Sequence, residues 1–554
     1  MQKDPLTQAH EGWKDFTLVF LLTLGIYIPF LGIPGFDGNE PIRVIVAREM
    51  LRTGNWIIPM LHGKPYFLKP PLMNWLIAAT GGLSGVINEW TARLPSVLLT
   101  LLTCIAVHSL TKNWMSREGR LFSAIATLST AGLIIKGRTA EPDSMFIFFV
   151  TLIFLVWING YGRQWKPALT WIVSLSLLGI GFLAKGPQII GFFYLSIFTY
   201  LLYKKNLAFF FSRYHAAGIC VFIAILGVYL FAILGQISLD EYISMWTAQI
   251  TQRGRSRQSL GFVTHFLSYP FKAMTEFLPW IVFVVPAIIF KDLRNKMKEI
   301  FRNDLFVFSL IILIVNFPLY WLLPGARVRY FLPAVPFFAV ITGLLFEYYL
   351  SLSNDHGGIR FFLKGVPKVL SWATLLVAST VPILVAFLGL SFSPSSVLLI
   401  ILLALLSIVT IRRINSLSPT TFPAVIALFT GLYFLLYTDF DIRYDMKKEA
   451  YPRKVAGEIN RLLPDDAQRV YELGYDRFLE VTCYLTKEVI QLDSFAELRS
   501  LERRGRVFFI YNTKFLNSRK DEEKTILRDE IKWDKVYSKY NADDNDEIIV
   551  GHFR

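Results

Sequence analysis

The chain has 554 residues, of which 54% are hydrophobic and only 18% are charged, and its formal net charge is +15. This composition excludes an ordinary soluble globular protein, which carries more charge, and repeated apolar runs of about 20 residues are typical of membrane-spanning helices. Basic loops at one face of a membrane account for the positive charge, so we expect no nucleic-acid partner. The three cysteines and seven histidines are scattered without metal-ligand spacing.

Thirteen apolar runs predict an α-helical, polytopic membrane protein. The first run, "FTLVFLLTLGIYIPFLGI", is long and lacks a small-residue cleavage site, so we interpret it as a retained span and not as a signal peptide. The runs are centred near residues 24, 102, 127, 151, 175, 195, 225, 283, 313, 340, 379, 403 and 430.

Basic residues alternate between the loops that join these runs, and this alternation sets the expected orientation. If the N-terminus is cytoplasmic, every loop on the inner side is basic, whereas the outer side carries two long segments, 34–90 and 236–275. Residues 1–440 are therefore expected to form a transmembrane domain with these two segments as periplasmic loops.

The tail of the chain differs in kind, because the long apolar runs stop near residue 440. "RVYEL", "EVIQL", "RVFFIY" and "DEIIVGHF" predict short strands, whereas "RKVAGEINRLL" and "SFAELRSLERR" predict helices with apolar residues at helical spacing. Residues 441–554 are therefore expected to form a small soluble α/β domain, and an odd number of spans puts this domain in the periplasm.

The stretch "GFDGNEPIRVIVAREM" places Asp37 and Glu40 where the first apolar run ends. Ionisable residues beside lipid are costly, and they often mark function. One of the two carboxylates is a candidate general base for an acceptor hydroxyl. The alternative is structural: Asp37 caps a helix that begins here, and both charges are solvated.

A second acidic motif, "KGRTAEPDSMFIFF", contains Glu141 and Asp143 just before an apolar run. We interpret Asp143 as a catalytic-site carboxylate. Its structural alternative is a cap, because it falls near the start of a span, where the helix dipole favours an anion. Glu141, Arg138 and Tyr66 are candidates for positioning the acceptor or the sugar.

Cations are predicted on the same outer face. Lys69 lies in "HGKPYFLKPPLMNW", where two prolines fix the local turn, and Lys185 lies in "GFLAKGPQIIGFF", with hardly any loop between two spans. Arg327 and Arg329 open a span in "LPGARVRYFLPAVPFF". These four cations are candidates for binding a phosphate. The structural alternatives are snorkelling lysines and charges that only set topology.

Together these motifs resemble those of the GT-C glycosyltransferases that use polyprenyl-phosphate sugars. Within the wider protein-O-mannosyltransferase-like superfamily, the chain is most similar to the bacterial aminoarabinose transferases that act on lipid A. The resemblance runs through "NEPIRVIVAREMLRTGNWIIPMLHGKPYFLKPPLMNW", "TARLPS", "AEPDSMFIFF", "LAKGP" and "RVRYFLPAVP", across roughly the first 340 residues. It implies a GT-C fold of about thirteen spans with a periplasmic C-terminal domain.

The resemblance also implies a base. In the family an Asp-Glu pair opens the first periplasmic helix, and its aspartate is the base candidate. That pair aligns here with Asn39 and Glu40. Because an asparagine cannot act as a base, we expect Asp37, two positions earlier, to replace the aspartate, while Glu40 keeps its place.

Further residues match the family one by one. Asp143 matches its second periplasmic acid, and Lys69 matches a lysine thought to contact the donor phosphate. Some relatives have a glutamate, reported near a metal, just before this lysine. Leu68 stands at that position here, so we expect neither a metal nor another cofactor.

The combined expectation is a multi-pass glycosyltransferase of the bacterial inner membrane, present as a monomer in the lipid bilayer. It would move a single sugar from a polyprenyl-phosphate donor to lipid A, lipopolysaccharide or another glycolipid on the periplasmic face, with inversion. A protein hydroxyl is the alternative acceptor. The alternative from another class is a polytopic lipid or solute transporter, which usually has ionisable residues at mid-membrane and repeated halves.

Overall fold

The computed structural model describes residues 5–163, 165–255, 261–290, 297–387, 392–448, 451–473, 479–501, 507–518, 521–527, 531, 533–541 and 546–553. The chain folds as two compact units, each built from two separate stretches of sequence. The helical unit comprises residues 1–31 and 93–439, and the mixed unit comprises residues 32–92 and 440–554.

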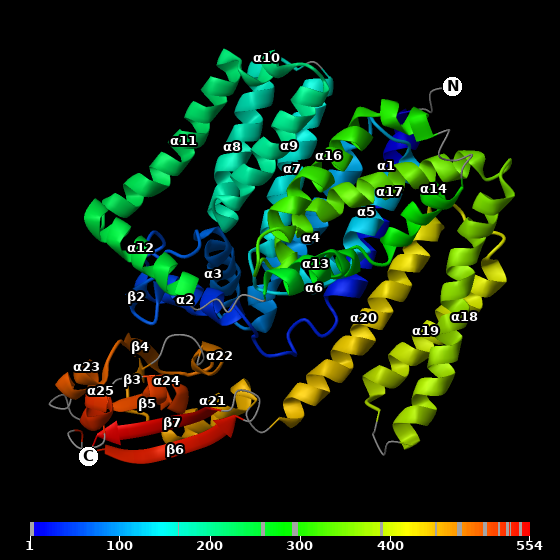
Figure 1. The fold of residues 1–554 in the computed structure, drawn as a ribbon. Helices are drawn as coiled ribbons and strands as arrows, with labels where there is room; N and C mark the ends of the chain where they lie inside the picture. The colour runs from blue at the N-terminus through cyan, green and yellow to red at the C-terminus, as the bar shows by residue number, and fades with distance from the viewer. Residues whose placement is uncertain are drawn as a thin grey trace. The chain divides into compact units, whose positions relative to one another are not determined.

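The helical unit consists of helices of very different lengths, labelled in Figure 1. They are α1 (Pro5–Tyr27), α4 (Glu89–Leu110), α5 (Arg117–Ser129), α6 (Ala131–Lys136), α7 (Asp143–Gly162), α8 (Pro167–Lys185), α9 (Gln188–Tyr203), α10 (Leu207–Phe210), α11 (Arg213–Leu234), α12 (Leu239–Arg255), α13 (Phe262–Glu276), η1 (Trp280–Val284), α14 (Val285–Ile289), η2 (Met297–Arg302), α16 (Asp304–Trp321), η3 (Val328–Tyr330), η4 (Leu332–Ala334), α17 (Val335–Leu352), α18 (Gly357–Phe387), α19 (Pro394–Arg413) and α20 (Thr421–Lys447).

The thirteen apolar runs all fall on helices, but they do not all form straight spans. Within the described ranges, nine helical stretches are long and apolar enough to cross a membrane, namely those of α4, α7, α8, α11, α16, α17, α18, α19 and α20. The other runs form α1, the 13-residue α5, the 16-residue α9, and the pair of α13 with η1 and α14, which is bent by 95°. Counting the bent pair gives up to ten.

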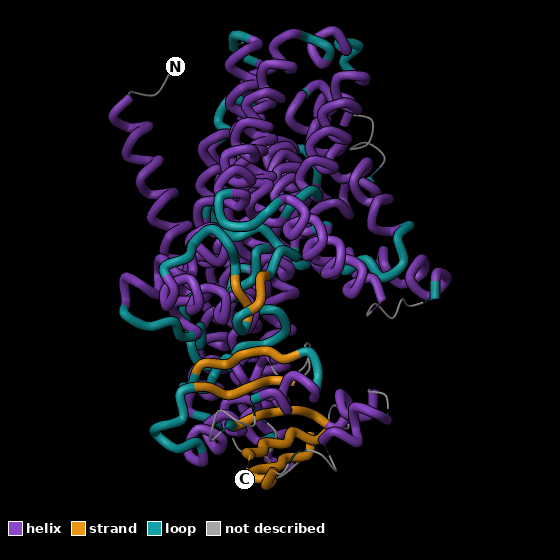
Figure 2. The backbone as a smooth tube through the Cα atoms, turned by 90° about the vertical axis from the view of Figure 1, so that its left-hand side faces the viewer, coloured by secondary structure: helices purple, strands orange, loops and turns teal. Residues whose placement is uncertain are grey.

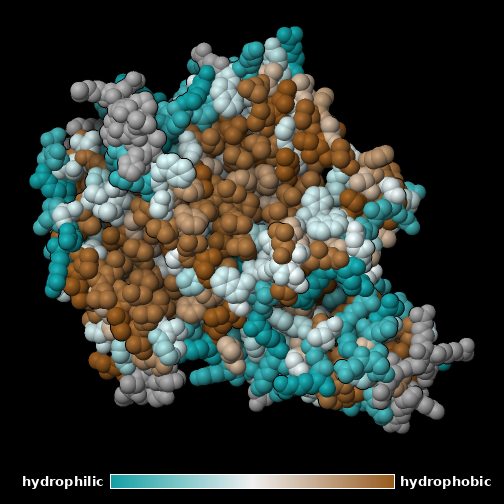
Figure 3. Space-filling view, turned by 180° about the vertical axis from the view of Figure 1, so that it is seen from behind, coloured by the Kyte–Doolittle hydropathy of each residue, from teal (hydrophilic) through white to brown (hydrophobic). Residues whose placement is uncertain are grey.

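Apolar side chains occur in two environments in the helical unit: some pack in its interior, and others are exposed on its surface. Phe122 on α5 packs on Trp280, Phe283 and Phe346, with ring centroids 4.5 to 4.9 Å apart. Other large apolar side chains are exposed, such as Phe231 at 81%, and Figure 3 shows a broad apolar surface over the helices. Exposed apolar helix faces are what a lipid-embedded protein presents.

The mixed unit combines short helices with strands, which are orange in Figure 2. Its first stretch contains α2 (Glu40–Thr53), β1 (Met60–Leu61), β2 (Lys64–Pro65) and α3 (Leu72–Ser84). Its second stretch contains α21 (Pro452–Leu462), β3 (Arg469–Leu473), α22 (Leu479–Thr482), β4 (Glu488–Leu492), α23 (Phe495–Ser500), β5 (Phe508–Asn512), α24 (Thr513–Ser518), α25 (Asp521–Thr525), β6 (Trp533–Asn541) and β7 (Asp546–Phe553).

The second stretch forms a five-stranded sheet in the order β4-β3-β5-β7-β6, in which β3 pairs in parallel with β4 and β5, and the other pairs are antiparallel. Val470 and Ile510 pack with α21 in one core, whereas Leu473 and Phe509 pack with α23 in another. The alternation along each strand thus supplies both cores. The four predicted strands are confirmed, and β6, with its polar sequence "WDKVYSKYN", was missed.

The segment expected to be a loop of the transmembrane domain, 34–90, lies in the same unit as the C-terminal sheet. The backbone N–H of Gln491 donates to the carbonyl oxygen of His62 (3.0 Å), and Nδ1 of His62 lies 2.6 Å from Oε2 of the buried Glu472. Lys64 Nζ lies 2.5 Å from Asp493 Oδ1. Contacts between residues some 400 positions apart leave no local pattern, so hydropathy could not reveal this shared unit.

Candidate active site

Alternating charges gather in the helical unit where several elements begin or end. α6 ends at Lys136, α7 begins at Asp143, α8 ends at Lys185, and the short turn η3 carries Arg329. Glu141 lies in the connection between α6 and α7. Helix ends are where side chains at the edge of an apolar layer become available for chemistry.

The local sequence explains why these elements stop where they do. Pro142 precedes the first turn of α7, a position in which proline is tolerated because no intrahelical N–H is needed there. Gly186 has φ +90°, a conformation that favours glycine, and it ends α8 just before Pro187. Asp143 in a first turn and Lys185 in a last turn both match the helix dipole.

The distances define a continuous ionic series. Nζ of Lys185 lies 2.5 Å from Oδ1 of Asp143, and Nη1 of Arg329 lies 2.6 Å from Oε1 of Glu141. The same Nη1 lies 3.7 Å from Oδ2 of Asp143, and Nζ of Lys136 lies 2.5 Å from Oε2 of Glu141. We call these five residues the charge series. It has three cations and two carboxylates, and outside it the carboxyl group of Glu276 also interacts electrostatically with Lys136.

The charge series is largely removed from water. The side chains of Asp143 and Lys185 are 3% and 4% exposed, and that of Arg329 is 16% exposed. Desolvating an ion costs several kcal/mol, so each of these groups depends on its neighbours of opposite sign. An anion that enters beside Lys185 and Arg329 would meet two cations in a medium of low dielectric constant, where attraction is strong.

Aromatic rings border the cationic part of the series. Nζ of Lys185 lies 4.8 Å from the ring centre of Phe146 and 5.3 Å from that of Tyr330. Nε2 of Gln188, the first residue of α9, donates to the hydroxyl of Tyr320 (2.8 Å) and to the carbonyl oxygen of Tyr330 (3.0 Å). These contacts hold η3 against the ends of α8 and α9.

Two polar atoms beside the charge series are buried and have no hydrogen-bond partner among the described residues: Nε of Arg329 and Oγ of Ser144. A buried donor that lacks a partner costs about 1–3 kcal/mol, which an added ligand can remove. Burial, the largest influence, lowers the pKa of Arg329, but the carboxylates of Asp143 and Glu141 outweigh it and raise the pKa overall. Arg329 therefore stays a full cation with one donor unused.

Among the described residues, two arginines predicted for the site form no ion pair with the charge series. Arg138 donates through Nη1 to the carbonyl oxygen of Ile26 (2.6 Å) and through Nη2 to that of Pro29 (2.5 Å). Its guanidinium also covers the ring of Phe434 at 5.5 Å. Arg138 thus satisfies carbonyl groups at the end of α1, whereas Arg327 is exposed.

The acidic stretch in the mixed unit forms a tight turn before α2. The backbone N–H of Asp37 donates to Oε2 of Glu40 (3.1 Å), and the N–H of Glu40 donates back to the carbonyl oxygen of Asp37 (3.1 Å). Asn39 is the N-cap residue and makes no side-chain cap bond. Glu40 is buried, whereas Asp37 is exposed, and its carboxylate makes no hydrogen bond or ion pair with any described residue. The helix therefore does not use the Asp37 side chain as its cap.

The lysine motif lies in the same unit. Nη2 of Arg43 donates to the hydroxyl of the buried Tyr66 (3.1 Å), and its guanidinium lies 5.3 Å from the Tyr66 ring. Lys69 is partly exposed and precedes α3. Nε of Arg43 and both amide atoms of Asn74 are buried and have no hydrogen-bond partner in the part of the chain that the structure describes. Tyr66 is thus paired to an arginine that sequence reasoning did not single out.

Residues from the C-terminal stretch hold the acidic turn by its backbone. The hydroxyls of Tyr451 and Tyr484 accept hydrogen bonds from the N–H groups of Gly35 (2.9 Å) and Phe36 (2.6 Å). Oε1 of Glu480 accepts from the N–H of Gly38 (3.3 Å). The pairs of residues are more than 400 positions apart in the chain, so the turn depends on the C-terminal segment for its shape.

Tyr484 is itself fixed on its other side. Its hydroxyl donates to Oε1 of Glu89 (2.6 Å), and Arg453 donates to the same oxygen. Burial, together with the hydrogen bond to Glu89, raises the pKa of Tyr484 above its usual range. The hydroxyl therefore keeps its proton, and it acts as donor to Glu89 and as acceptor from Phe36.

Several of these residues were missed by sequence reasoning. Lys136 opens the quoted motif "KGRTAEPDSMFIFF", and its place five residues before Glu141 was the available signal. Gln188 follows Lys185 closely, but a neutral amide gives no signal of its own. Tyr484 and Glu89 lie in unremarkable local sequence. Within the described ranges, no group of three or more His, Cys, Asp or Glu residues is placed to hold a metal ion.

Comparison with known proteins adds relatives in sequence. A family model described as dolichyl-phosphate-mannose-protein mannosyltransferase matches residues 68–232. An uncharacterized protein of Aquifex aeolicus is 26% identical over 466 residues, which cover 83% of this chain and 85% of that protein. The undecaprenyl phosphate-alpha-4-amino-4-deoxy-L-arabinose arabinosyl transferase of Pseudomonas savastanoi pv. phaseolicola is 28% identical over 180 residues, which cover 32% of this chain and only 34% of that transferase.

Comparison of structures extends the likeness to nearly the whole chain. The crystal structure of ArnT from Cupriavidus metallidurans bound to undecaprenyl phosphate superposes with a TM-score of 0.71 and 17% identity, and the match covers 98% of both chains. The chain therefore has the GT-C fold of a multi-pass membrane protein. The predicted fold class and the resemblance to polyprenyl-phosphate-dependent glycosyltransferases are confirmed.

The pair formed by Lys185 and Asp143 should be essential for stability. Lys185→Met keeps the length of the side chain but leaves Asp143 buried beside one fewer cation, so we expect a loss of about 3–5 kcal/mol in the free energy of unfolding. Thermal unfolding of the purified protein in detergent measures this loss. Lys204→Met is the control, because its pair with Asp304 (2.9 Å) is 31% exposed on both sides, and it should cost about 0–1 kcal/mol. Equal losses of unfolding free energy in the two variants would contradict an essential role of the buried pair of Lys185 and Asp143.

Proposed function

We propose that this protein is a glycosyltransferase that moves one sugar from a polyprenyl-phosphate donor to lipid A, lipopolysaccharide or another glycolipid. The observation that carries the proposal is the buried charge series, which brings Lys185 and Arg329 together and leaves Nε of Arg329 without a partner among the described residues. The proposal is supported by the fold shared with a protein crystallised with undecaprenyl phosphate.

The chemistry follows from the leaving group. The acceptor hydroxyl oxygen forms a bond to the anomeric carbon while the bond from that carbon to the phosphate oxygen breaks, and the polyprenyl phosphate leaves with the electron pair. Attack from the side opposite the phosphate inverts the configuration. A phosphate needs little acid assistance, but its growing charge needs cations that are already in place. Arg329 and Lys185 supply them, and Lys69 and Arg327 are further candidates for the donor phosphate.

The hydroxyl proton goes to a carboxylate. We assign this role to Asp37, because its carboxylate is exposed and uncommitted, whereas Glu40 accepts a hydrogen bond from the turn. Glu40 then shapes the turn, and it is the second candidate for the base. Asp143, with Glu141, is proposed to orient the sugar or the acceptor in addition to holding Lys185 and Arg329.

The C-terminal stretch has a role in this proposal. Tyr451, Tyr484 and Glu480 bind three backbone N–H groups of the acidic turn, so they fix the direction in which Asp37 points. Positioning of this kind matters because a displacement of about 1 Å costs up to a factor of 10² in rate. The orientation that fits the proposal has the N-terminus in the cytoplasm and the acidic turn and C-terminal stretch in the periplasm of a bacterial inner membrane.

A protein hydroxyl is the second candidate acceptor, and the description of the family model that matches residues 68–232 favours it. Mass spectrometry of lipid A, surface glycans and envelope proteins from cells with and without the gene separates the two. Loss of a sugar from lipid A or a glycolipid is expected. Loss of a sugar from proteins alone would identify a protein as the acceptor. Unchanged glycans in all fractions would contradict the proposal that the protein is a glycosyltransferase.

Removing the charge of the base should stop transfer and spare the fold. We expect Asp37→Asn to lower the rate of sugar transfer by about 10²–10⁴-fold, because the hydroxyl proton loses its acceptor. The purified variant is assayed for sugar transfer, donor binding and thermal stability, with Asp466→Asn, an exposed carboxylate of the same unit, as control. Normal transfer by Asp37→Asn together with a large loss in Glu40→Gln would move the base to Glu40. Normal transfer by both would refute a base in this turn.

Tyr484→Phe removes the hydroxyl that accepts the hydrogen bond from the N–H of Phe36, and it tests whether this contact positions the acidic turn. We expect the turnover number to fall by about 10- to 100-fold with little change in KM for the donor, because the base is displaced while the donor site is kept. Tyr537→Phe is the matched control, since the Tyr537 hydroxyl bonds Glu458 (2.6 Å) within the same unit and away from the turn. An equally small change in turnover number in both tyrosine variants would contradict a role of Tyr484 in positioning the turn.

A further inference from the structure

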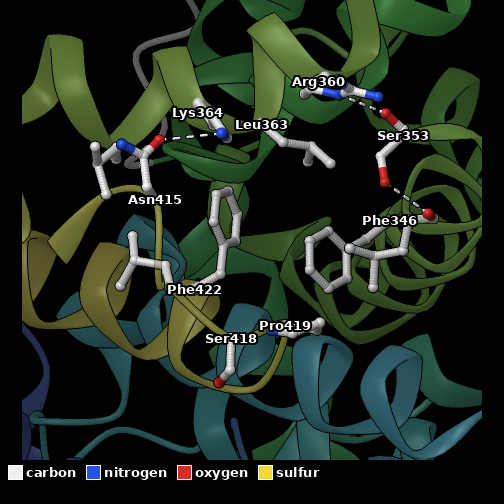
Figure 4. Close-up of a pocket in the computed structure, with 12 residues that line it drawn as sticks. Phe346, Ser353, Arg360, Leu363, Lys364, Asn415, Ser418, Pro419 and Phe422 are labelled. Atoms are coloured by element: carbon white, nitrogen blue, oxygen red, sulfur yellow. Dashed lines mark hydrogen bonds between the residues drawn. The ribbon is translucent and has the colours of Figure 1, made fainter. Parts of the chain in front are cut away.

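A cavity of about 170 Å³ lies in the helical unit at the ends of four spans. It is an open pocket lined by the last turns of α17, the first turns of α18, and the connection from α19 to α20, as Figure 4 shows. Neither the charge series nor the acidic turn contributes to it. Its lining includes Phe346, Leu363, Phe422, Arg360, Lys364 and Asn415.

The cavity and the charge series lie at opposite ends of one helix. α17 begins at Val335, shortly after the turn that carries Arg329, and ends at Leu352, next to the cavity. The helix is 18 residues long. At 1.5 Å per residue this is about 27 Å, close to the thickness of the hydrocarbon layer of a membrane. Because α17 is apolar enough to span a membrane, the cavity belongs to the opposite membrane face and is a separate site.

The cavity combines an apolar floor with a cationic rim. The rings of Phe346 and Phe422 are buried and form the floor. On the rim, Nζ of Lys364 donates to Oδ1 of Asn415 (3.0 Å), and Arg360 donates to the carbonyl oxygens of Ser353 (2.9 Å) and Asn354. Across the described residues, neither cation forms an ion pair with a carboxylate, so both charges remain uncompensated.

The position of these cations on α18 is unfavourable without an anion. Arg360, Lys364 and Lys368 repeat every four residues, so they lie along one face of the helix, and like charges at this spacing repel. Arg360 also lies in the first turn of α18, where the helix dipole disfavours a cation. Ser418, which also lines the cavity, caps α20: its Oγ accepts a hydrogen bond from the N–H of Thr421 (3.2 Å).

We propose that this cavity binds the headgroup of an anionic glycerophospholipid. A phosphate between Arg360 and Lys364 would remove the repulsion along α18, and the glycerol and first acyl carbons would lie on the two phenylalanines. The acyl chains have a path, because Phe361 on α18 and Leu405 and Val409 on α19 are exposed apolar residues on neighbouring turns, at 80%, 53% and 55%. A small inorganic anion would leave this apolar floor without a partner.

The test uses the full-length protein, purified in detergent, with native mass spectrometry as the readout of retained lipid. Dioleoyl phosphatidylglycerol is compared with dioleoyl phosphatidylethanolamine at equal concentration. We expect preferential retention of phosphatidylglycerol, and a fall in its apparent affinity of about 10- to 30-fold in Arg360→Gln/Lys364→Gln, since each basic residue near an anionic headgroup contributes about one factor of five. Lys166→Gln, an exposed lysine outside the cavity, should retain the lipid like the wild type.

A second variant separates a shaped cavity from general attraction to charge. Leu363→Trp fills the cavity and keeps both cations, so it should lose phosphatidylglycerol to a similar extent while the variant remains folded by thermal unfolding. Retention by Leu363→Trp, equal retention of the two lipids, or no effect of the double charge substitution would each overturn the proposal. Competition by 10 mM inorganic phosphate alone, roughly ten-thousandfold above a micromolar lipid affinity, would assign the site to a small anion instead.

Discussion

A cation at the edge of an apolar layer is stable only with an anion in contact, and in this protein Lys185 meets that requirement at Asp143. The pair ties the end of α8 to the start of α7. Arg329 then joins through Glu141, which brings the turn before α17 to the same place. The ends of several spans are thus fixed by one ionic series, whose formation is a condition for both the fold there and any chemistry.

The same series explains why function belongs at helix ends in this chain. The series leaves Nε of Arg329 buried without a partner among the described residues. A buried donor of this kind is costly unless an added ligand completes the site. The mixed unit contributes in another way, because a tyrosine and a glutamate far along the chain bind the backbone of a turn whose aspartate is uncommitted. Cationic and acidic groups are thereby prepared in separate units.

Sequence reasoning located much of this and missed what depends on distant contacts. Glu141, Asp143, Lys185 and Arg329 were found because each borders an apolar run, and the structure brings these four together. Arg138 borders such a run too, but its guanidinium donates to backbone carbonyl oxygens. The pattern of charges in the sequence does not predict such a contact. The thirteen apolar runs are helical, yet hydropathy cannot register the break at Thr130 between α5 and α6. The link between residues 32–92 and the C-terminal sheet rests on hydrogen bonds such as Tyr484 to Phe36, which have no local signature.

The most direct measurement is the affinity of the purified protein for undecaprenyl phosphate, with and without the cation that has an unused donor. Titration is made on the wild type, on Arg329→Gln and on Arg163→Gln, an exposed arginine outside the series, each checked for thermal stability. If the charge series binds the donor phosphate, Arg329→Gln should bind about 10- to 150-fold more weakly, as expected for hydrogen bonds to a charged group, and Arg163→Gln should match the wild type. Equal affinity of a folded Arg329→Gln and the wild type would contradict the account.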